Sequence, residues 1–151
     1  MGTTRLLAAL VAGAFLAATG HAHDDATLDQ HPAPSGGQLR QAGAYHLELV
    51  VARDASATSP SPVAVYVTDH GGQKIAVAGV KGNATLLGGG TKASIELKPD
   101  GDNRLSGTGK YSADPAMKVV VALTFADGKT EQVRFEPFKA RALAVPGGAK
   151  H

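Results

Sequence analysis

The feature that most constrains the fold is a repeated alternation of apolar and polar residues between positions 36 and 135. Successive side chains of a β-strand point to opposite faces, so this alternation predicts strands with one buried and one exposed face. The pattern is clearest over residues 91–98, where Ala93, Ile95 and Leu97 share one face. Gly, Pro, Asp and Asn separate the runs, as turns between strands require.

The spacing of these runs predicts about eight short strands. We expect them over residues 45–51, 63–68, 74–77, 82–87, 91–98, 104–111, 118–125 and 130–135. Short strands at intervals of about 8–12 residues are typical of an antiparallel β-sandwich or barrel. No helical period follows residues 1–22. The predicted fold class is therefore all-β, preceded by a signal helix that is cleaved off.

Residues 1–22 have the pattern of a secretory signal peptide. Arg5 supplies the positive charge, residues 6–18 are apolar or small, and Gly20 and Ala22 stand where a signal peptidase requires small residues. The apolar run is shorter than the roughly 20 residues of a membrane-spanning helix. We therefore expect export to a periplasm, with no membrane span once the leader is removed.

The remaining chain is expected to form one domain with a flexible segment at each end. Residues 23–35 are polar and rich in Ala, Pro and Asp, which predicts a flexible arm that carries His23 and His31. Residues 36–136 form the predicted β-sandwich domain. Residues 137–151 lack a period and are predicted to be a flexible C-terminal tail.

The composition excludes several classes of function. The chain has no cysteine, which rules out disulfides, zinc–thiolate sites and cysteine nucleophiles. Loss of residues 1–22 removes only Arg5 from the 15 basic residues, which leaves 14 basic and 13 acidic residues. The basic residues are scattered singly along the sequence, which argues against a nucleic-acid partner. The sequence contains no nucleophile elbow, phosphate loop or zinc-protease motif, so we expect no enzymatic activity.

Histidine is the residue type that remains for chemistry. Imidazole suits Cu, Zn, Ni and Co, and a chain without cysteine must combine imidazole with carboxylates to hold such ions. The candidate metal ligands are His23, His31, His46, Glu48 and His70. Cu(II) is the expected ion, with Zn, Ni or Co as alternatives. Binding is expected to weaken below pH ~6, where imidazoles become protonated.

The start of the arm could bind copper in either of two cleavage products. Cleavage after Ala22 makes His23 the first residue, and its amine and imidazole would form a chelate. Cleavage after Gly20 gives His-Ala-His, in which the third-position imidazole and backbone nitrogens form a square-planar site that Cu(II) and Ni(II) prefer. The sequence leaves the cleaved bond open.

The histidines inside the domain form a second candidate group. His46 and Glu48 are two residues apart on a predicted strand, so both point away from the face of Leu47 and Leu49. His70 belongs to the turn that follows residue 68. The simpler alternative is a surface histidine bonded to a carboxylate, with ordinary turn chemistry at His70. A metal site requires His46, His70 and an arm histidine to converge, which the sequence does not determine.

Four parts of the sequence carry a family resemblance: residues 36–50, 65–72 (VYVTDHGG), 83–87 (NATLL) and 103–105 (NRL). They resemble small periplasmic proteins that accompany proteobacterial heavy-metal resistance and efflux systems. They also resemble a domain near the N-terminus of some metal-efflux periplasmic adaptor subunits. The resemblance spans residues 35–135. It implies a β-sandwich that binds or passes on a transition metal, with His46 and His70 at the matched positions.

The chain departs from this family at one position. The family run is Pro-His-Gly-Gly, whereas this chain has Pro34-Ser35-Gly36-Gly37. Either His31 replaces the missing histidine, or the metal function is weakened or lost.

These features together predict a periplasmic protein that binds or handles a transition metal in heavy-metal homeostasis. A metal-efflux envelope complex is the expected partner. The alternative is a non-enzymatic envelope interaction module that docks through a strand edge or its loops and has no metal site.

Overall fold

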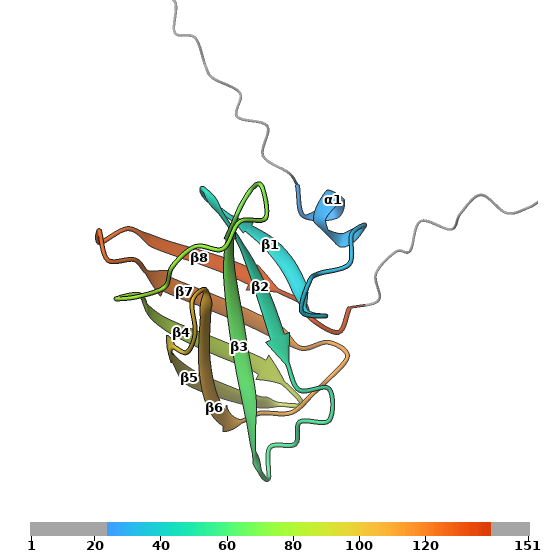
Figure 1. Ribbon diagram of the computed structural model, residues 1–151. Helices are drawn as coiled ribbons and strands as arrows, with labels where there is room; N and C mark the ends of the chain where they lie inside the picture. Colours follow the sequence, from blue (N-terminus) through green and yellow to red (C-terminus); the bar gives the residue numbers. More distant parts are fainter. Residues whose placement is uncertain (1–23, 140–151) are drawn as a thin grey trace, which may run out of the picture.

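The computed structural model describes residues 24–139, which form eight strands and one short helix. The strands make one antiparallel, nearly closed, barrel-like sheet (Figure 1), so the prediction of an all-β fold with eight antiparallel strands is confirmed. The elements are α1 (Asp25–Asp29), β1 (Gln38–Ala42), β2 (Tyr45–Val51), β3 (Pro60–Asp69), β4 (Lys81–Gly88), β5 (Thr91–Pro99), β6 (Arg104–Lys110), β7 (Lys118–Thr124) and β8 (Thr130–Phe135). The predicted signal peptide and His23 lie outside the described residues.

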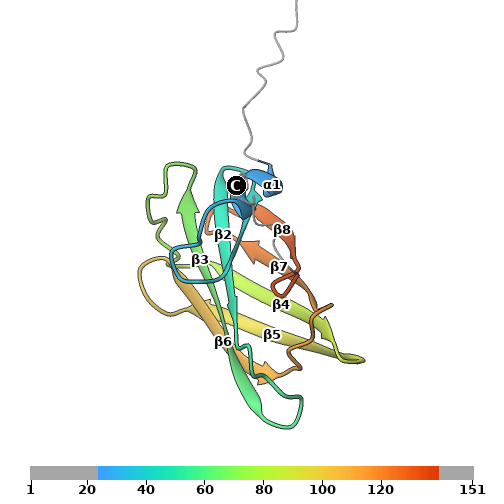
Figure 2. The same ribbon diagram turned by 90° about the vertical axis from the view of Figure 1, so that its right-hand side faces the viewer.

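The strand order is β1-β2-β3-β6-β5-β4-β7-β8, which divides the barrel into two layers of four strands. β1, β2, β3 and β6 form one layer, and β5, β4, β7 and β8 form the other. Only two residue pairs, Lys98–Ser106 and Pro99–Leu105, join the layers between β5 and β6. Figure 2 shows the strands of the two layers crossing one another. The core lies between the layers.

The alternation in the sequence matches the two faces of the strands. Leu47 and Leu49 of β2 are fully buried, and their neighbours His46 and Glu48 point to the outer face. The strand β7 lies between β4 and β8. The core side chains with the least exposed surface are Leu47, Leu49, Val63, Val65, Val67, Val77, Ala84, Leu86, Leu97, Leu105, Tyr111, Met117, Val119, Val121, Leu123 and Phe135.

A side chain closes the barrel between β1 and β8. No backbone ladder pairs these two strands in residues 24–139. The Gln38 amide nitrogen donates to the carbonyl oxygen of Glu136 at 3.1 Å, and its amide oxygen accepts from the Glu136 backbone N–H at 2.8 Å. Gln38 therefore supplies, with its side chain, the donor and acceptor that a neighbouring strand would supply from its backbone.

The helix α1 packs against β1 beside this seam. Asp24 caps the helix by accepting from the Thr27 N–H at 2.8 Å. The buried Arg40 of β1 donates to Asp29 at 2.8 Å and lies 3.7 Å from Asp25. The sequence analysis expected no helix after residue 22, and α1 is a correction to that expectation. No helix within residues 24–139 is long and apolar enough to cross a membrane.

One predicted strand is absent and another was missed. Residues 74–77 do not form a strand, since only Lys74 is paired, in an isolated bridge with Thr68. Residues 38–42 do form one, although their inward positions include the polar Gln38 and Arg40. Eight strands were predicted and eight are present, but the strand at residues 38–42 takes the place of the one predicted at residues 74–77.

Tyr111 ties the end of β6 to β2 and β3. Its hydroxyl donates to the Pro62 carbonyl at 2.6 Å and accepts from the Ala52 N–H at 2.9 Å. Burial raises the pKa of Tyr111, so the hydroxyl stays protonated and can donate at neutral pH.

Replacing Tyr111 with phenylalanine is expected to lower the free energy of unfolding by about 1–3 kcal/mol, because two backbone groups lose their partner. Urea denaturation measures this loss. Tyr66→Phe is the matched control, because the Tyr66 hydroxyl makes no hydrogen bond within the described part of the chain. Equal losses in the two variants would contradict the assigned role of Tyr111.

Candidate metal site

Two histidines from different elements are in contact on the outer face of β2 and β3. The imidazole rings of His46 and His70 are stacked, with centroids 4.7 Å apart and 15° between their planes. His46 lies in β2 between Gln41 of β1 and Thr68 of β3. His46 is only 8% exposed although it faces away from the core. The structure therefore brings together two of the predicted ligands.

The turn after β3 places His70. The Asp69 carboxylate accepts from the backbone N–H groups of Gly71 and Gln73, both at 2.8 Å. The Gly72 N–H donates to the Asp69 carbonyl at 3.1 Å, and Gly72 has a φ of 81° that favours glycine. Asp69 thus organises a tight turn around His70. The pairing of Asp69 with Tyr45 holds this turn beside the start of β2.

A carbonyl group orients the ring of His70. Its Nε2 lies 3.1 Å from the carbonyl oxygen of Gly43, in the turn between β1 and β2. A carbonyl oxygen only accepts, so Nε2 donates its proton, and in neutral imidazole the lone pair is then on Nδ1. Ligating histidines are commonly fixed in this way by a backbone carbonyl on the other ring nitrogen.

Glu48 is engaged by the chain that precedes β1. It lies on the same face as His46, two residues further along β2, as predicted. Its carboxylate accepts from the backbone N–H groups of Ser35 and Gly37, each at 2.9 Å, and is only 3% exposed. These bonds hold residues 34–37 against the outer face of β2. Holding this segment is a structural role that the sequence did not predict.

A hollow of about 270 Å³ lies on the same outer face, although neither His46 nor His70 lines it. It shares Glu48 and Thr68, the neighbours of His46, and Gly72 from the turn that carries His70. The residues that line it are Pro34, Ser35, Leu39, Glu48, Tyr66, Thr68, Gly72, Lys74 and Asn103. Ser35, which was singled out in the sequence, therefore borders this hollow.

The predicted ligands do not all meet. His31 follows α1 and is exposed, and His23 lies outside the described residues. Within residues 24–139, no group of three or more His, Cys, Asp or Glu side chains is placed to hold a metal ion. Two stacked rings also direct their in-plane lone pairs along roughly parallel planes. Because a bound ion lies close to the plane of each ligating ring, the two rings must tilt towards each other to share an ion at about 2 Å.

Of the residues that position the histidine pair, the sequence predicted the turn that Asp69 organises, because Asp and Gly are frequent in such turns. It missed Gly43, whose carbonyl accepts from His70. The sequence contained no signal for Gly43, since its role depends on the approach of two separate turns.

Known proteins include a distant structural neighbour of this chain. No family model and no curated protein matches this chain. Among solved structures, the chain is similar to a DUF4426 family protein from Pseudomonas aeruginosa PAO1. The sequences are 15% identical, the TM-score is 0.42, and the match covers 65% of this chain and 92% of that chain. A likeness of this degree carries no argument about fold or function.

Proposed function

We propose that the protein binds a transition-metal ion through the imidazoles of His46 and His70 and handles that ion in a periplasm. Cu(II) is the favoured ion, and Zn, Ni and Co are alternatives that imidazole also suits. The protein would capture or pass on the ion for heavy-metal homeostasis, with a metal-efflux envelope complex as its partner. No reaction is proposed for it.

The contact between His46 and His70 is the observation that carries this proposal. The two residues are separated by a strand and a turn, and both belong to the segments that resemble metal-resistance proteins. The hydrogen bond from His70 Nε2 to Gly43 leaves Nδ1 as the ligating atom. His70 is exposed and stands on a turn, so its ring can tilt towards a shared ion.

Two imidazoles complete only part of a coordination sphere. His31 and His23 of the N-terminal arm are the proposed additional ligands, and water can fill the remaining positions. Glu48 has lone pairs beyond those bonded to Ser35 and Gly37, so it stays a candidate ligand beside His46.

A competition titration tests the proposal. The mature, untagged protein would be titrated with Cu(II), Zn(II) and Ni(II) against a coloured chelator, beside the His46→Ala/His70→Ala double variant and a chain that begins at Asp24. The proposal predicts that the double variant loses binding. Binding that survives in the double variant but is lost in the shortened chain would assign the metal to the terminal chelate alone.

A substitution at Ser35 tests the proposal through a gain of metal affinity. Because Ser35 lines the hollow beside Glu48, Ser35→His is expected to add an imidazole and to tighten Cu(II) binding by about 10–100-fold. The same titration measures the change. Ser61→His, on β3 far from the histidine pair, is the control and should leave the affinity unchanged. A Ser35→His variant with wild-type affinity would contradict this placement of the site.

An interaction module without a metal site is the second candidate function. The outward face of β4, β5, β7 and β8 favours it, because this exposed face carries an excess of basic residues that can dock on an anionic component of the envelope.

A further inference from the structure

The outer face of β5, β4, β7 and β8 is a regular array of side chains. The strand registers align the outward residues in rows across the four strands, such as Ser94, Thr85, Val120 and Arg134. The inward residues of the same strands fill the core, so every second side chain points outward. We call this outer surface of β5, β4, β7 and β8 the β4 face.

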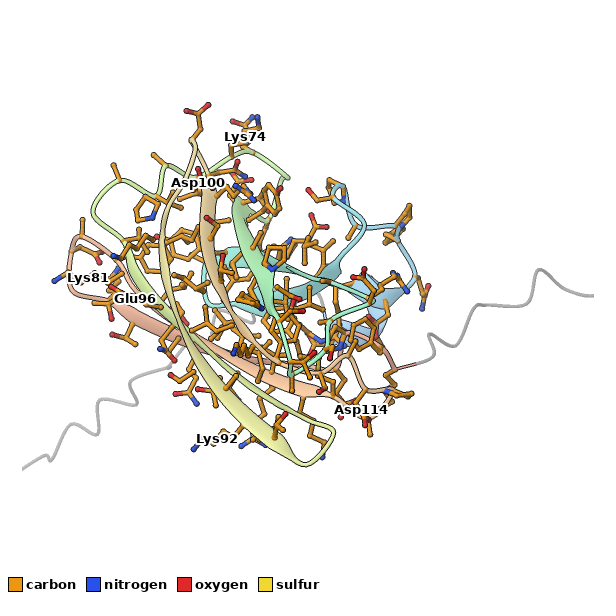
Figure 3. The ribbon with its side chains drawn as sticks, turned by 90° about the horizontal axis from the view of Figure 1, so that it is seen from below. Lys74, Lys81, Lys92, Glu96, Asp100 and Asp114 are labelled. Atoms are coloured by element: carbon orange, nitrogen blue, oxygen red, sulfur yellow. The ribbon has the colours of Figure 1, made fainter. Side chains whose placement is uncertain are left out.

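Positive charge dominates the β4 face. Its basic residues are Lys81, Lys92, Lys98, Lys118 and Arg134, and its acidic residues are Glu96 and Glu136. Both carboxylates are already paired, Glu96 with Lys98 at 3.8 Å and Glu136 with Lys139 at 3.0 Å. Figure 3 shows Lys81, Lys92 and Glu96 extending outward from β4 and β5.

Four cations on this face form no salt bridge within residues 24–139, namely Lys81, Lys92, Lys118 and Arg134. Most described carboxylates are elsewhere, on α1 and in the turns between strands. The nearly neutral composition therefore conceals a charge separation, which the sequence analysis missed by treating the basic residues as scattered.

Leu87 lies among these cations. It is 43% exposed and is the only large apolar side chain so exposed in the described part of the chain. Its neighbours across β5 and β7 are Lys92 and Lys118. An apolar side chain flanked by two lysines can enter the headgroup region of a bilayer while the ammonium groups contact lipid phosphates.

The residue types favour a lipid surface over a protein partner. Protein interfaces are enriched in Trp, Tyr, Phe and Arg and depleted in Lys. The β4 face has the opposite composition, since lysine dominates it and its outward positions contain no aromatic residue. Self-association through this face would bring like charges together. Anionic phospholipid headgroups complement it without specific pockets.

We propose that the β4 face docks the protein on the surface of a bilayer that contains anionic phospholipid. The unpaired cations supply the attraction, and Leu87 inserts between them. The β4 face belongs to one layer of the barrel, and His46 and His70 lie on the other layer. Docking therefore leaves the face that carries His46 and His70 uncovered, and it does not depend on metal binding.

Vesicle sedimentation tests this proposal with the mature protein. The vesicles would contain either phosphatidylcholine alone or equal parts of phosphatidylglycerol and phosphatidylcholine, at low and at high salt. The test variant is Lys81→Gln/Lys92→Gln/Lys118→Gln. The matched control is Arg53→Gln/Lys74→Gln/Lys110→Gln, which removes the same charge from exposed positions outside the β4 face.

The expected result is binding to the anionic vesicles that salt weakens, with little binding to phosphatidylcholine. Each cation near an anionic surface contributes a factor of about five, so the test variant should bind about 100-fold more weakly. The control variant should lose far less. Equal losses in the two variants would overturn the proposal, because net charge alone would then explain binding. Absence of binding to anionic vesicles would also overturn it and would leave an acidic protein surface as the occupant to test.

Discussion

A Gly107→Ala variant is expected to lose about 3 kcal/mol of its unfolding free energy, because β5 and β6 leave no room for a side chain there. A Cβ atom at position 107 would overlap the backbone carbonyl of Glu96 and lie 2.6 Å from the Ile95 side chain. The obstacle includes backbone, which rotation of a side chain cannot relieve. Alanine in an ordinary strand position is instead more favourable than glycine by about 0.5–1 kcal/mol.

The reason for this close approach is the corner of the barrel. β6 pairs with β3 along most of its length and with β5 over only two residue pairs, so it passes from one layer towards the other. Chemical denaturation measures the effect. Thr108→Ala, one position further along β6 and exposed, is the control and should change stability by less than about 0.5 kcal/mol. A Gly107→Ala protein as stable as the Thr108→Ala protein would show that β6 and β5 are further apart than described.

A His70→Ala variant is expected to bind Cu(II) about 100-fold more weakly than the wild type, since it removes one of two proposed imidazole ligands. His70 is exposed, and Asp69 holds its turn through bonds to Gly71 and Gln73. The fold should therefore survive the substitution, and thermal unfolding checks that it does. The affinity is measured by competition with a chelator of known strength.

His151→Ala is the matched control for this experiment, because it removes an imidazole that is not among the proposed ligands. It should leave the affinity within about twofold of the wild type. An equal loss in both variants would mean that copper binds imidazoles without preference. In that case, the contact between His46 and His70 would have no part in metal binding.

Most strands could be predicted from the sequence because burial on one face leaves a local pattern. The pattern of β2, β5 and β7 follows directly from the alternation of core and surface positions. The strand β1 lacks this pattern, because its inward residues Gln38 and Arg40 serve the seam and α1. The partner of Gln38 is Glu136, 98 residues away, and a contact of that range leaves no local signal.

The prediction of a strand at residues 74–77 was wrong for a related reason. Its residues alternate like those of a strand, and Val77 is fully buried. Their backbone groups nevertheless do not pair with one neighbouring strand, since the Ile75 N–H donates to the Val67 carbonyl and the Val77 N–H donates to the Asp102 carbonyl. Alternation reports which side chains are buried, but the neighbouring backbone decides whether a ladder forms.

The candidate site was predictable in part. The outward direction of His46 followed from the apolar face of β2. Its contact with His70 depends on the register between β2 and β3 and on the turn around Asp69, neither of which is local. The bonds from Ser35 and Gly37 to Glu48 depend on how the preceding segment folds back.

The most direct test of the central claim is pulsed electron paramagnetic resonance of the mature protein loaded with one equivalent of Cu(II). This measurement counts the imidazoles bound to copper through the remote nitrogens of the rings. The account predicts at least two imidazoles in the wild type and one fewer in His70→Ala and in His46→Ala. An unchanged number of imidazoles in both variants would contradict it, because copper would then be bound without the His46–His70 pair.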